Sequence, residues 1–158
     1  MNETHIWCDG GCRNNQEKEN VGGYGVVIKY NNQIFEYYQG EFNTTNNKQE
    51  LTSLVVGLAK TKDKKTPVTV IMDSSYVING MTKWRQKWVD RGFKTSSGKK
   101  LKNLFYWKTL FTLIDEFESV DFILCKGHSD NAGNERADEL ANIAMDEMEL
   151  LGQKNESN

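Results

Sequence analysis

Two aspartates stand at the ends of short apolar segments, which is where α/β proteins place their chemistry. Asp9 follows the segment HIWC, and Asp73 follows VTVIM, whose β-branched residues are typical of a buried strand. Active sites in open α/β sheets form at the carboxyl ends of parallel strands. If these two strands are parallel neighbours, the carboxylates lie about 5 Å apart, the spacing of adjacent strands.

Two further acids can join this pair. Glu50 and Asp138 each lie in a predicted helix, so four carboxylates can converge. Without cations, the repulsion between the carboxylates of such a cluster would destabilise the fold. Two Mg²⁺ ions about 4 Å apart would neutralise it, activate a water and stabilise the leaving oxygen of a phosphodiester. Each acid also has a structural interpretation: strand-end aspartates cap helices, Glu50 suits a helix N-terminus, and Asp138 faces solvent.

A histidine is available for proton transfer. His128 lies in the polar segment KGHSDNAGNER, which is predicted to be a loop. A loop histidine beside a metal cluster can move protons, and a solvated surface histidine is the alternative. His5 lies in the first predicted strand and is interpreted as structural.

The elements that must position these residues follow from the spacing of the apolar side chains. Strands are expected at residues 5–9, 24–30, 33–40, 68–72 and 120–125, with the glycine-rich segment 10–23 as a loop. Helices are expected near residues 48–60, 75–81, 84–90, 103–117 and 134–151. Three consecutive strands followed by crossover helices predict an α/β fold, with a mixed sheet and helices on its faces.

Charge is distributed unevenly along the chain. The formal net charge is −2, but residues 83–108 hold nine basic side chains and one acidic side chain. That segment therefore carries +8 and the rest of the chain −10. A single basic element on an otherwise acidic protein indicates a local contact with an anion.

The length and composition suit one domain, expected over residues 1–151 and followed by a flexible tail over 152–158. No apolar run approaches the ~20 residues of a membrane span, and the N-terminus lacks a signal-peptide pattern. The three cysteines, Cys8, Cys12 and Cys125, cannot all pair, so reduced thiols and a cytoplasmic location are expected. The pair Cys8 and Cys12 lacks the partners of a zinc site.

Six motifs in this order resemble the ribonuclease H family, in its bacterial type 1 branch. They are CDGGC at 8–12, GGYGVVI at 22–28, TTNNKQEL at 44–51, MDSSYVINGMTKW at 72–84, W-x3-GFKT at 88–95 and KGHSDNAGNERADELA at 126–141. The resemblance implies a ribonuclease H-like fold: a five-stranded mixed sheet of order 3-2-1-4-5, flanking helices and a basic handle. It implies a monomeric endonuclease that cuts the RNA strand of RNA–DNA hybrids, leaving 5′-phosphate and 3′-hydroxyl ends.

The resemblance also implies roles for particular residues. Asp9, Glu50, Asp73 and Asp138 would hold two Mg²⁺ ions, with Mn²⁺ as a substitute, and His128 would assist proton transfer or product release. The amides of Asn15, Asn46 and Asn47 would contact the RNA strand near its 2′-hydroxyls, the groups that distinguish RNA from DNA. The alternative for these asparagines is a role in turns.

The DNA strand would contact a second set of side chains. The residues that resemble its binding positions are Thr45, Tyr76, Trp84, Trp88, Ser96 and Asn103, and the handle cations are Lys87, Arg91, Lys94, Lys99, Lys100 and Lys102. Phosphate contacts position a duplex without reading its sequence, so little sequence preference and strong salt dependence are expected. Core packing is the alternative for the aromatic residues, and Trp107 is interpreted as core.

The chain departs from the family pattern in three places. The loop at 15–22 is longer and more charged than the proline-glycine loop of bacterial members. Phe93 stands where a tryptophan is usual, and Asn43 where some members place an arginine. These departures bear on substrate affinity, because no acid of the catalytic set is missing.

Three other functions are open to such a sequence. An integrase or transposase shares the sheet and the acids but usually lacks the handle and the KGH…ERADELA ending. A catalytically silent hybrid-binding module would have lost an acid. A hydrolase of small phosphate esters would lack the basic handle and have a second domain to form its pocket.

Overall fold

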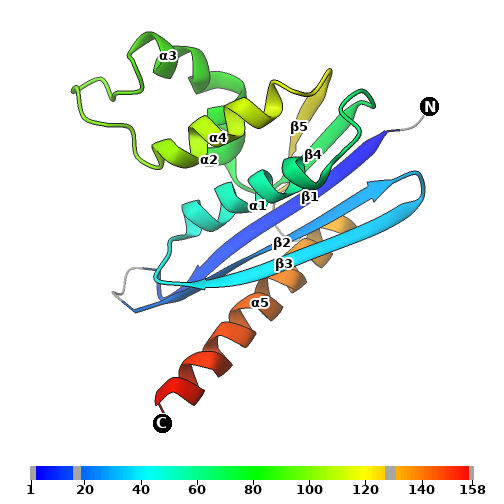
Figure 1. The fold of residues 1–158 in the computed structure, drawn as a ribbon, viewed down its shortest axis with the longest axis vertical. Helices are drawn as coiled ribbons and strands as arrows, with labels where there is room; N and C mark the ends of the chain where they lie inside the picture. The colour runs from blue at the N-terminus through cyan, green and yellow to red at the C-terminus, as the bar shows by residue number, and fades with distance from the viewer. Residues whose placement is uncertain (1–2, 16–18, 127–130, 157–158) are drawn as a thin grey trace.

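Figure 1 shows the computed structural model, which describes residues 3–15, 19–126 and 131–156. Its strands are β1 (Thr4–Arg13), β2 (Val21–Tyr30), β3 (Gln33–Phe42), β4 (Val68–Met72) and β5 (Val120–Leu124). Its α-helices are α1 (Asn46–Lys60), α2 (Ser75–Asn79), α3 (Arg85–Asp90), α4 (Leu104–Ile114) and α5 (Ala132–Glu156), with the π-helical turn η1 (Gly80–Trp84) between α2 and α3. Every predicted strand and helix is present in the described part of the chain.

The strands form one mixed sheet of order β3-β2-β1-β4-β5. β1, β2 and β3 are an antiparallel meander, and β4 and β5 extend the sheet in parallel with β1. The α/β class, the mixed sheet and the predicted strand order are therefore confirmed. β1 and β4 are parallel neighbours, which brings their carboxyl ends to one edge of the molecule.

The first hairpin is longer than expected. Residues 10–23 were predicted as a loop, but β1 continues to Arg13 and pairs with β2 back to Val21, so the prediction is wrong at both ends. The glycines that suggested a loop allow close packing instead. A Cβ atom at Gly10 would lie 2.3 Å from the backbone of Gln49 in α1.

Helices cover both faces of the sheet. α1 packs on β1 and β2 and also contacts α4, and the main core lies on this side. The largest fully buried side chains of that core include Ile6, Leu51, Leu54, Leu58, Met72, Trp107 and Leu110. On the other face, α5 runs behind β1, β2 and β3 and extends past the hairpin (Figure 1).

The residues between β4 and the basic loop form one uninterrupted helical stretch. Two separate helices were expected, at 75–81 and 84–90, but α2, η1 and α3 follow one another without a break. The π-helical turn begins at Gly80, where the Trp107 side chain packs so closely that a Cβ atom would lie 2.1 Å from the ring. A π turn inserts one extra residue into a helix and commonly occurs at functional sites.

The last helix is also longer than expected. Its end was predicted at Leu151, whereas α5 continues through Gly152 to Glu156, so helix replaces the first part of the expected tail. The domain boundary at residue 151 stays a prediction. Among the described residues, none of the helices combines the length and apolar character needed to cross a membrane.

Candidate active site

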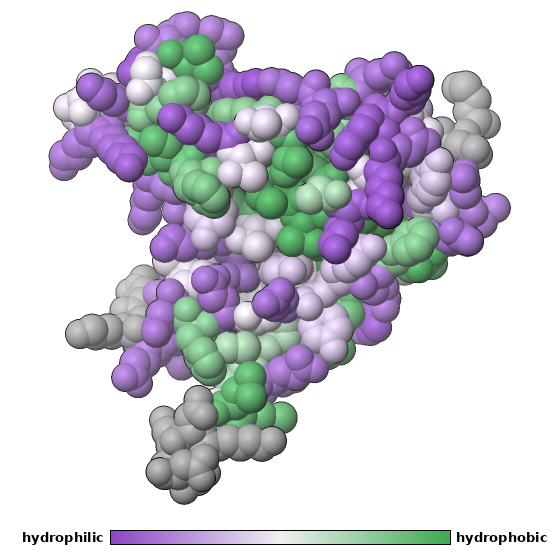
Figure 2. Space-filling model, in the orientation of Figure 1, coloured by the Kyte–Doolittle hydropathy of each residue, from purple (hydrophilic) through white to green (hydrophobic). Residues whose placement is uncertain are grey.

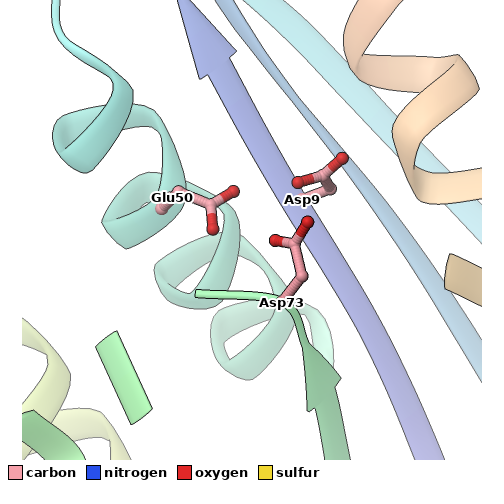
Figure 3. A group of neighbouring side chains, drawn as sticks. All are labelled: Asp9, Glu50 and Asp73. Atoms are coloured by element: carbon pink, nitrogen blue, oxygen red, sulfur yellow. The ribbon is translucent and has the colours of Figure 1, made fainter. Parts of the chain in front are cut away.

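Three of the four predicted acids meet at the edge where β1 and β4 lie side by side. Each of Asp9, Glu50 and Asp73 offers a carboxylate oxygen within 4.8 Å of the other two. Figure 3 shows the carboxylates pointing toward one another from β1, from α1 and from the end of β4. Asp9 and Glu50 are buried and Asp73 is exposed, so the cluster opens to solvent at Asp73.

A backbone amide ties two of these carboxylates together. The N–H of Gly10 donates to Oδ1 of Asp9 at 3.0 Å and also to Oε1 of Glu50. Glu50 lies one turn into α1, whose N-terminus is capped by the Thr45 hydroxyl accepting from Lys48 N at 3.1 Å. The absence of a side chain at Gly10 lets α1 approach β1 closely enough for this contact.

The protein environment disfavours the charged form of all three acids. Burial raises the pKa of Asp9 from 3.8 to about 7, and the charges of Asp73 and Asp138 contribute to the rise. Burial, followed by the charge of Asp9, raises the pKa of Glu50 well above its usual value. The pKa of Asp73 is raised by burial and by the charge of Asp138.

The donor set fits divalent cations. Within the described residues, no lysine or arginine forms an ion pair with Asp9, Glu50 or Asp73. Carboxylates held together without a positive partner are stabilised by binding a cation, and oxygen ligands are those that Mg²⁺ prefers. The cluster can therefore hold a metal ion, as the sequence predicted.

The fourth predicted acid stands beside the cluster. Asp138 projects from α5, on the other side of β1 from α1, and its side chain is exposed. It does not belong to the group of three, but its charge raises the pKa of both Asp9 and Asp73, so it lies close to them. His128 lies outside the described residues.

The predicted RNA-contacting asparagines gather at the N-terminus of α1. The Asn46 backbone N–H donates to Oδ1 of Asn15 at 2.8 Å, which joins the end of β1 to the start of the helix. Asn46 and Asn47 occupy the first turn of α1, and all three side chains are exposed. Glu50 follows on the same helix, so these amides lie next to the acidic cluster.

Four of the predicted DNA-contacting residues form a second group. The Tyr76 hydroxyl accepts from Asn103 Nδ2 at 3.1 Å and from Trp107 Nε1 at 3.2 Å. Trp84 lies between Tyr76 and Trp88, with ring centroids 6.3 and 5.8 Å away. Trp107 is completely buried, which confirms its interpretation as core.

The basic residues project from α3 and the loop after it. In that loop the backbone of Lys94 pairs with Lys100 in a short antiparallel bridge, and Gly98 adopts a φ of +83° at the turn. All six predicted handle cations are exposed, as is Ser96. Figure 2 shows mostly hydrophilic side chains on this projection, at the upper left. Thr45 is the N-cap residue of α1.

The sequence interpretation missed the functional importance of Gly10. It was assigned to a loop, although it provides the amide that joins Asp9 to Glu50. The signal for it was present, because a glycine directly follows the strand aspartate and a bulkier residue there would separate α1 from β1.

Comparisons with known proteins agree with this geometry. The sequence profile of the RNase H family matches residues 1–146. The curated proteins called ribonuclease H from Coxiella burnetii and Alcanivorax borkumensis are 41% and 39% identical over 148 residues, covering 94% of this chain and 93% and 95% of their own.

Solved structures show the same fold. LC9-RNase H1, described as a type 1 RNase H with the type 2 active-site motif, has a TM-score of 0.79 at 30% identity, covering 92% of this chain and 72% of its own. The foamy viral protease-reverse transcriptase in complex with RNA/DNA hybrid has a TM-score of 0.79 at 19% identity, covering 90% of this chain and 20% of its own. The latter likeness concerns the fold alone.

Proposed function

This chain belongs to the RNase H family, and from that premise we propose that it cleaves the RNA strand of RNA–DNA hybrids with two divalent metal ions. The products would carry 5′-phosphate and 3′-hydroxyl ends. The observation that carries the proposal is the meeting of Asp9, Glu50 and Asp73, with Asp138 beside them.

The acids would act as ligands, and the Gly10 amide as the group that orients two of them. Bound divalent ions would supply Lewis acidity at the scissile phosphate and lower the pKa of an attacking water. Mg²⁺ is the proposed ion, with Mn²⁺ as a substitute, because both take oxygen ligands. His128 would assist proton transfer or product release.

The two groups of polar and aromatic residues would hold the two strands of the hybrid. Asn15, Asn46 and Asn47 would contact 2′-hydroxyls beside the acids, which confines cleavage to RNA. Tyr76, Trp84, Trp88 and Asn103, together with Thr45 and Ser96, would contact the DNA strand, and the basic handle would contact its phosphates. Such contacts position the duplex without reading its sequence.

A cleavage assay with matched variants tests the proposal. With Mg²⁺, the wild type should cut the RNA of a labelled hybrid and leave single-stranded RNA and duplex DNA intact. Replacement of the acids, by Asp9→Asn, Glu50→Gln, Asp73→Asn or Asp138→Asn, should lower kcat by at least about 100-fold, the order seen when transition-state charge loses its stabilisation. Asp121→Asn, on exposed β5, should cleave normally.

Three results would contradict the proposal or part of it. Full activity of Asp73→Asn would remove that residue from the ligand set. Equal cleavage of single-stranded RNA would show that the asparagines and the handle do not select the hybrid. Binding of hybrid without any cleavage would instead indicate a silent binding module.

We further propose that the protein works as a monomer in the cytoplasm. One chain supplies all four acids, the asparagines and the handle, so a second copy is not needed to complete the site. Light scattering of the purified protein should give a mass close to 18.1 kDa, and a dimer mass would contradict this proposal.

A further inference from the structure

A hollow lies on the face of the sheet that carries α5. The helix packs on β1, β2 and β3, and the same face of β4 and β5 extends beyond it. One row of paired residues crosses four strands there: Ile123 pairs with Ile71, Ile71 with Trp7, and Trp7 with Val27. This apolar row is the floor of a pocket of about 810 Å³, which we call the α5-side pocket.

The N-terminal turns of α5 form one wall of this pocket. Gly133 packs so closely on the Trp7 ring that a Cβ atom there would lie 2.2 Å away. The Arg136 guanidinium donates hydrogen bonds to both carboxylate oxygens of Glu36 on β3, with N–O distances of 2.7 and 3.0 Å. These contacts close the pocket at the helix, while the opposite side stays open, with Ile123 51% exposed.

The rim of the α5-side pocket is positively charged. Lys29 and Lys126 line it, both are exposed, and within the described residues neither forms an ion pair. Glu36 is the only acid among the described lining residues, and Arg136 neutralises it. The pocket therefore combines an apolar floor with two lysines that no described acid neutralises.

We propose that the α5-side pocket binds a small amphipathic organic anion: an aromatic or aliphatic body that covers Ile71, Trp7 and Ile123, with one carboxylate or sulfonate at the lysines. The volume lies within the range of about 300–1,000 Å³ typical of small-molecule sites. Apolar contact supplies most of the affinity in such sites, and a few charged groups fix the orientation of the ligand.

The bound anion would also affect the metal site. Trp7 precedes Asp9 by two residues on β1, and Ile71 precedes Asp73 by two residues at the end of β4, a distance of about 6.6 Å along each chain segment. The ligand's charge would lie at Lys126, which follows the end of β5 next to the end of β4. Charges closer than a Debye length, about 8–10 Å at ordinary salt, repel one another. A divalent cation at the cluster removes this repulsion, so each ligand should strengthen the binding of the other. This coupling rests on the proposed metal site, whereas the pocket itself does not.

Fluorescence titration with two probes tests the pocket. 8-Anilinonaphthalene-1-sulfonate carries an aromatic body and one negative charge, and N-phenyl-1-naphthylamine has a similar body without the charge. The native protein should bind the anionic probe at one site and the neutral probe more weakly. Ile123→Asp should weaken binding of the anionic probe by at least tenfold. The double variant Lys29→Gln/Lys126→Gln should weaken it several-fold and leave the neutral probe unaffected.

Matched controls exclude binding elsewhere. Phe105→Asp removes the most exposed large apolar side chain of the described residues, on α4, and Lys65→Gln removes an exposed cation that does not line the pocket. Neither should change the affinity for the anionic probe. The pocket proposal is overturned if Ile123→Asp binds the anionic probe as the wild type does, or if the lysine variant loses the same affinity for both probes. It is also overturned if the probe fluoresces only with protein that no longer unfolds cooperatively.

The coupling has its own readout. Added Mg²⁺, at constant ionic strength, should tighten binding of the anionic probe several-fold in the wild type and have no effect in Asp9→Asn/Asp73→Asn. Unchanged affinity with Mg²⁺ in the wild type would refute the coupling. If hybrid cleavage failed while the Ile123 and lysine variants behaved as expected, the proposed function would fall and the pocket would stand.

Discussion

The acidic cluster carries stored repulsion that the metal-free protein must tolerate. Asp9 is only 8% exposed, and its pKa is raised from 3.8 to about 7 by burial and by its acidic neighbours. Between these two values the folded chain binds more protons than the unfolded chain. The stability of the metal-free protein therefore falls as the pH rises through that window.

Asp9→Asn should relieve this repulsion. At pH 8 without metal, the variant should melt several degrees above the wild type, where about 1 kcal/mol corresponds to roughly 2–4 °C for a protein of this size. At pH 4 the two should melt together, because Asp9 is then protonated. Mg²⁺ should raise the melting temperature of the wild type at pH 8 far more than that of the variant. Asp121→Asn is the control for removing an exposed carboxylate. If Asp9→Asn and the wild type have the same melting temperature at pH 8, the predicted repulsion at Asp9 is absent.

The hydroxyl of Tyr76 satisfies a buried donor. It accepts from Nε1 of Trp107, whose side chain is fully buried. Tyr76→Phe leaves that N–H without its partner, which should cost about 1–3 kcal/mol of unfolding free energy in urea melts. Tyr106→Phe on α4 is the control for removing a tyrosine hydroxyl, and it should change stability by less than about 0.5 kcal/mol. If Tyr76→Phe lowers the free energy of unfolding by no more than Tyr106→Phe does, the Tyr76 hydroxyl does not stabilise the buried Trp107 N–H.

At the scale of elements, glycines decide how closely α5 lies on the sheet. A Cβ atom at Gly25 of β2 would meet the carbonyl oxygen of Ala137 at 2.1 Å and the Leu140 side chain at 2.7 Å. Because Asp138 is the residue after Ala137, this contact also sets the distance of the fourth acid from β1.

Gly25→Ala should push α5 away from β2. Overpacking of this kind costs about 1–3 kcal/mol, and the calorimetric affinity for Mg²⁺ should fall because Asp138 moves with the helix. In Gly152→Ala the nearest atom lies 3.8 Å from the new Cβ, so both quantities should stay near wild type. If Gly25→Ala is less stable but binds Mg²⁺ as tightly as the wild type does, the position of α5 does not determine the metal affinity.

The sequence predicted the elements well where side chains repeat with a clear period. The apolar spacing in α1 gave that helix almost at its observed bounds, and β3 was placed within two residues of its observed end. It failed where glycine has a packing role, because Gly10, Gly22 and Gly23 look like turn residues but lie in β1 and β2. The predicted break between α2 and α3 failed for a tertiary reason: Trp107, a residue distant in the chain, packs against Gly80.

The acids could be predicted because strand ends and helix faces limit where they point. Asp9, Glu50 and Asp73 meet as expected, although the strand of Asp9 runs four residues past it. The bifurcated contact of Gly10 could not be predicted, since it depends on how deeply α1 settles against β1. The role of His128 stays a prediction.

At the scale of the whole molecule, charge is separated into a basic projection and an acidic remainder. Residues 83–108 carry +8 and the rest of the chain −10. A polyanionic duplex would therefore be attracted to one end of the protein and repelled by the rest, which orients it before binding.

The combined variant Lys99→Gln/Lys100→Gln/Lys102→Gln should weaken hybrid binding, most clearly at low salt, and raise KM while kcat changes little. The slope of log Kd against log salt should fall by about 1 for each phosphate that the handle no longer neutralises. Lys62→Gln/Lys65→Gln, at exposed positions outside the handle, is the control. An unchanged KM and slope would remove the handle from substrate binding.

The four tryptophans give the molecule two separate optical reporters. Trp84, Trp88 and Trp107 lie ring to ring, with successive centroid distances of 5.8 and 4.8 Å, so excitation of one is shared among the three. Trp7 lies on the other face of the sheet and stacks on His5 at 5.6 Å. Emission from the trio would follow events at the handle, and emission from Trp7 events under α5, so unlabelled protein can register both in one cuvette.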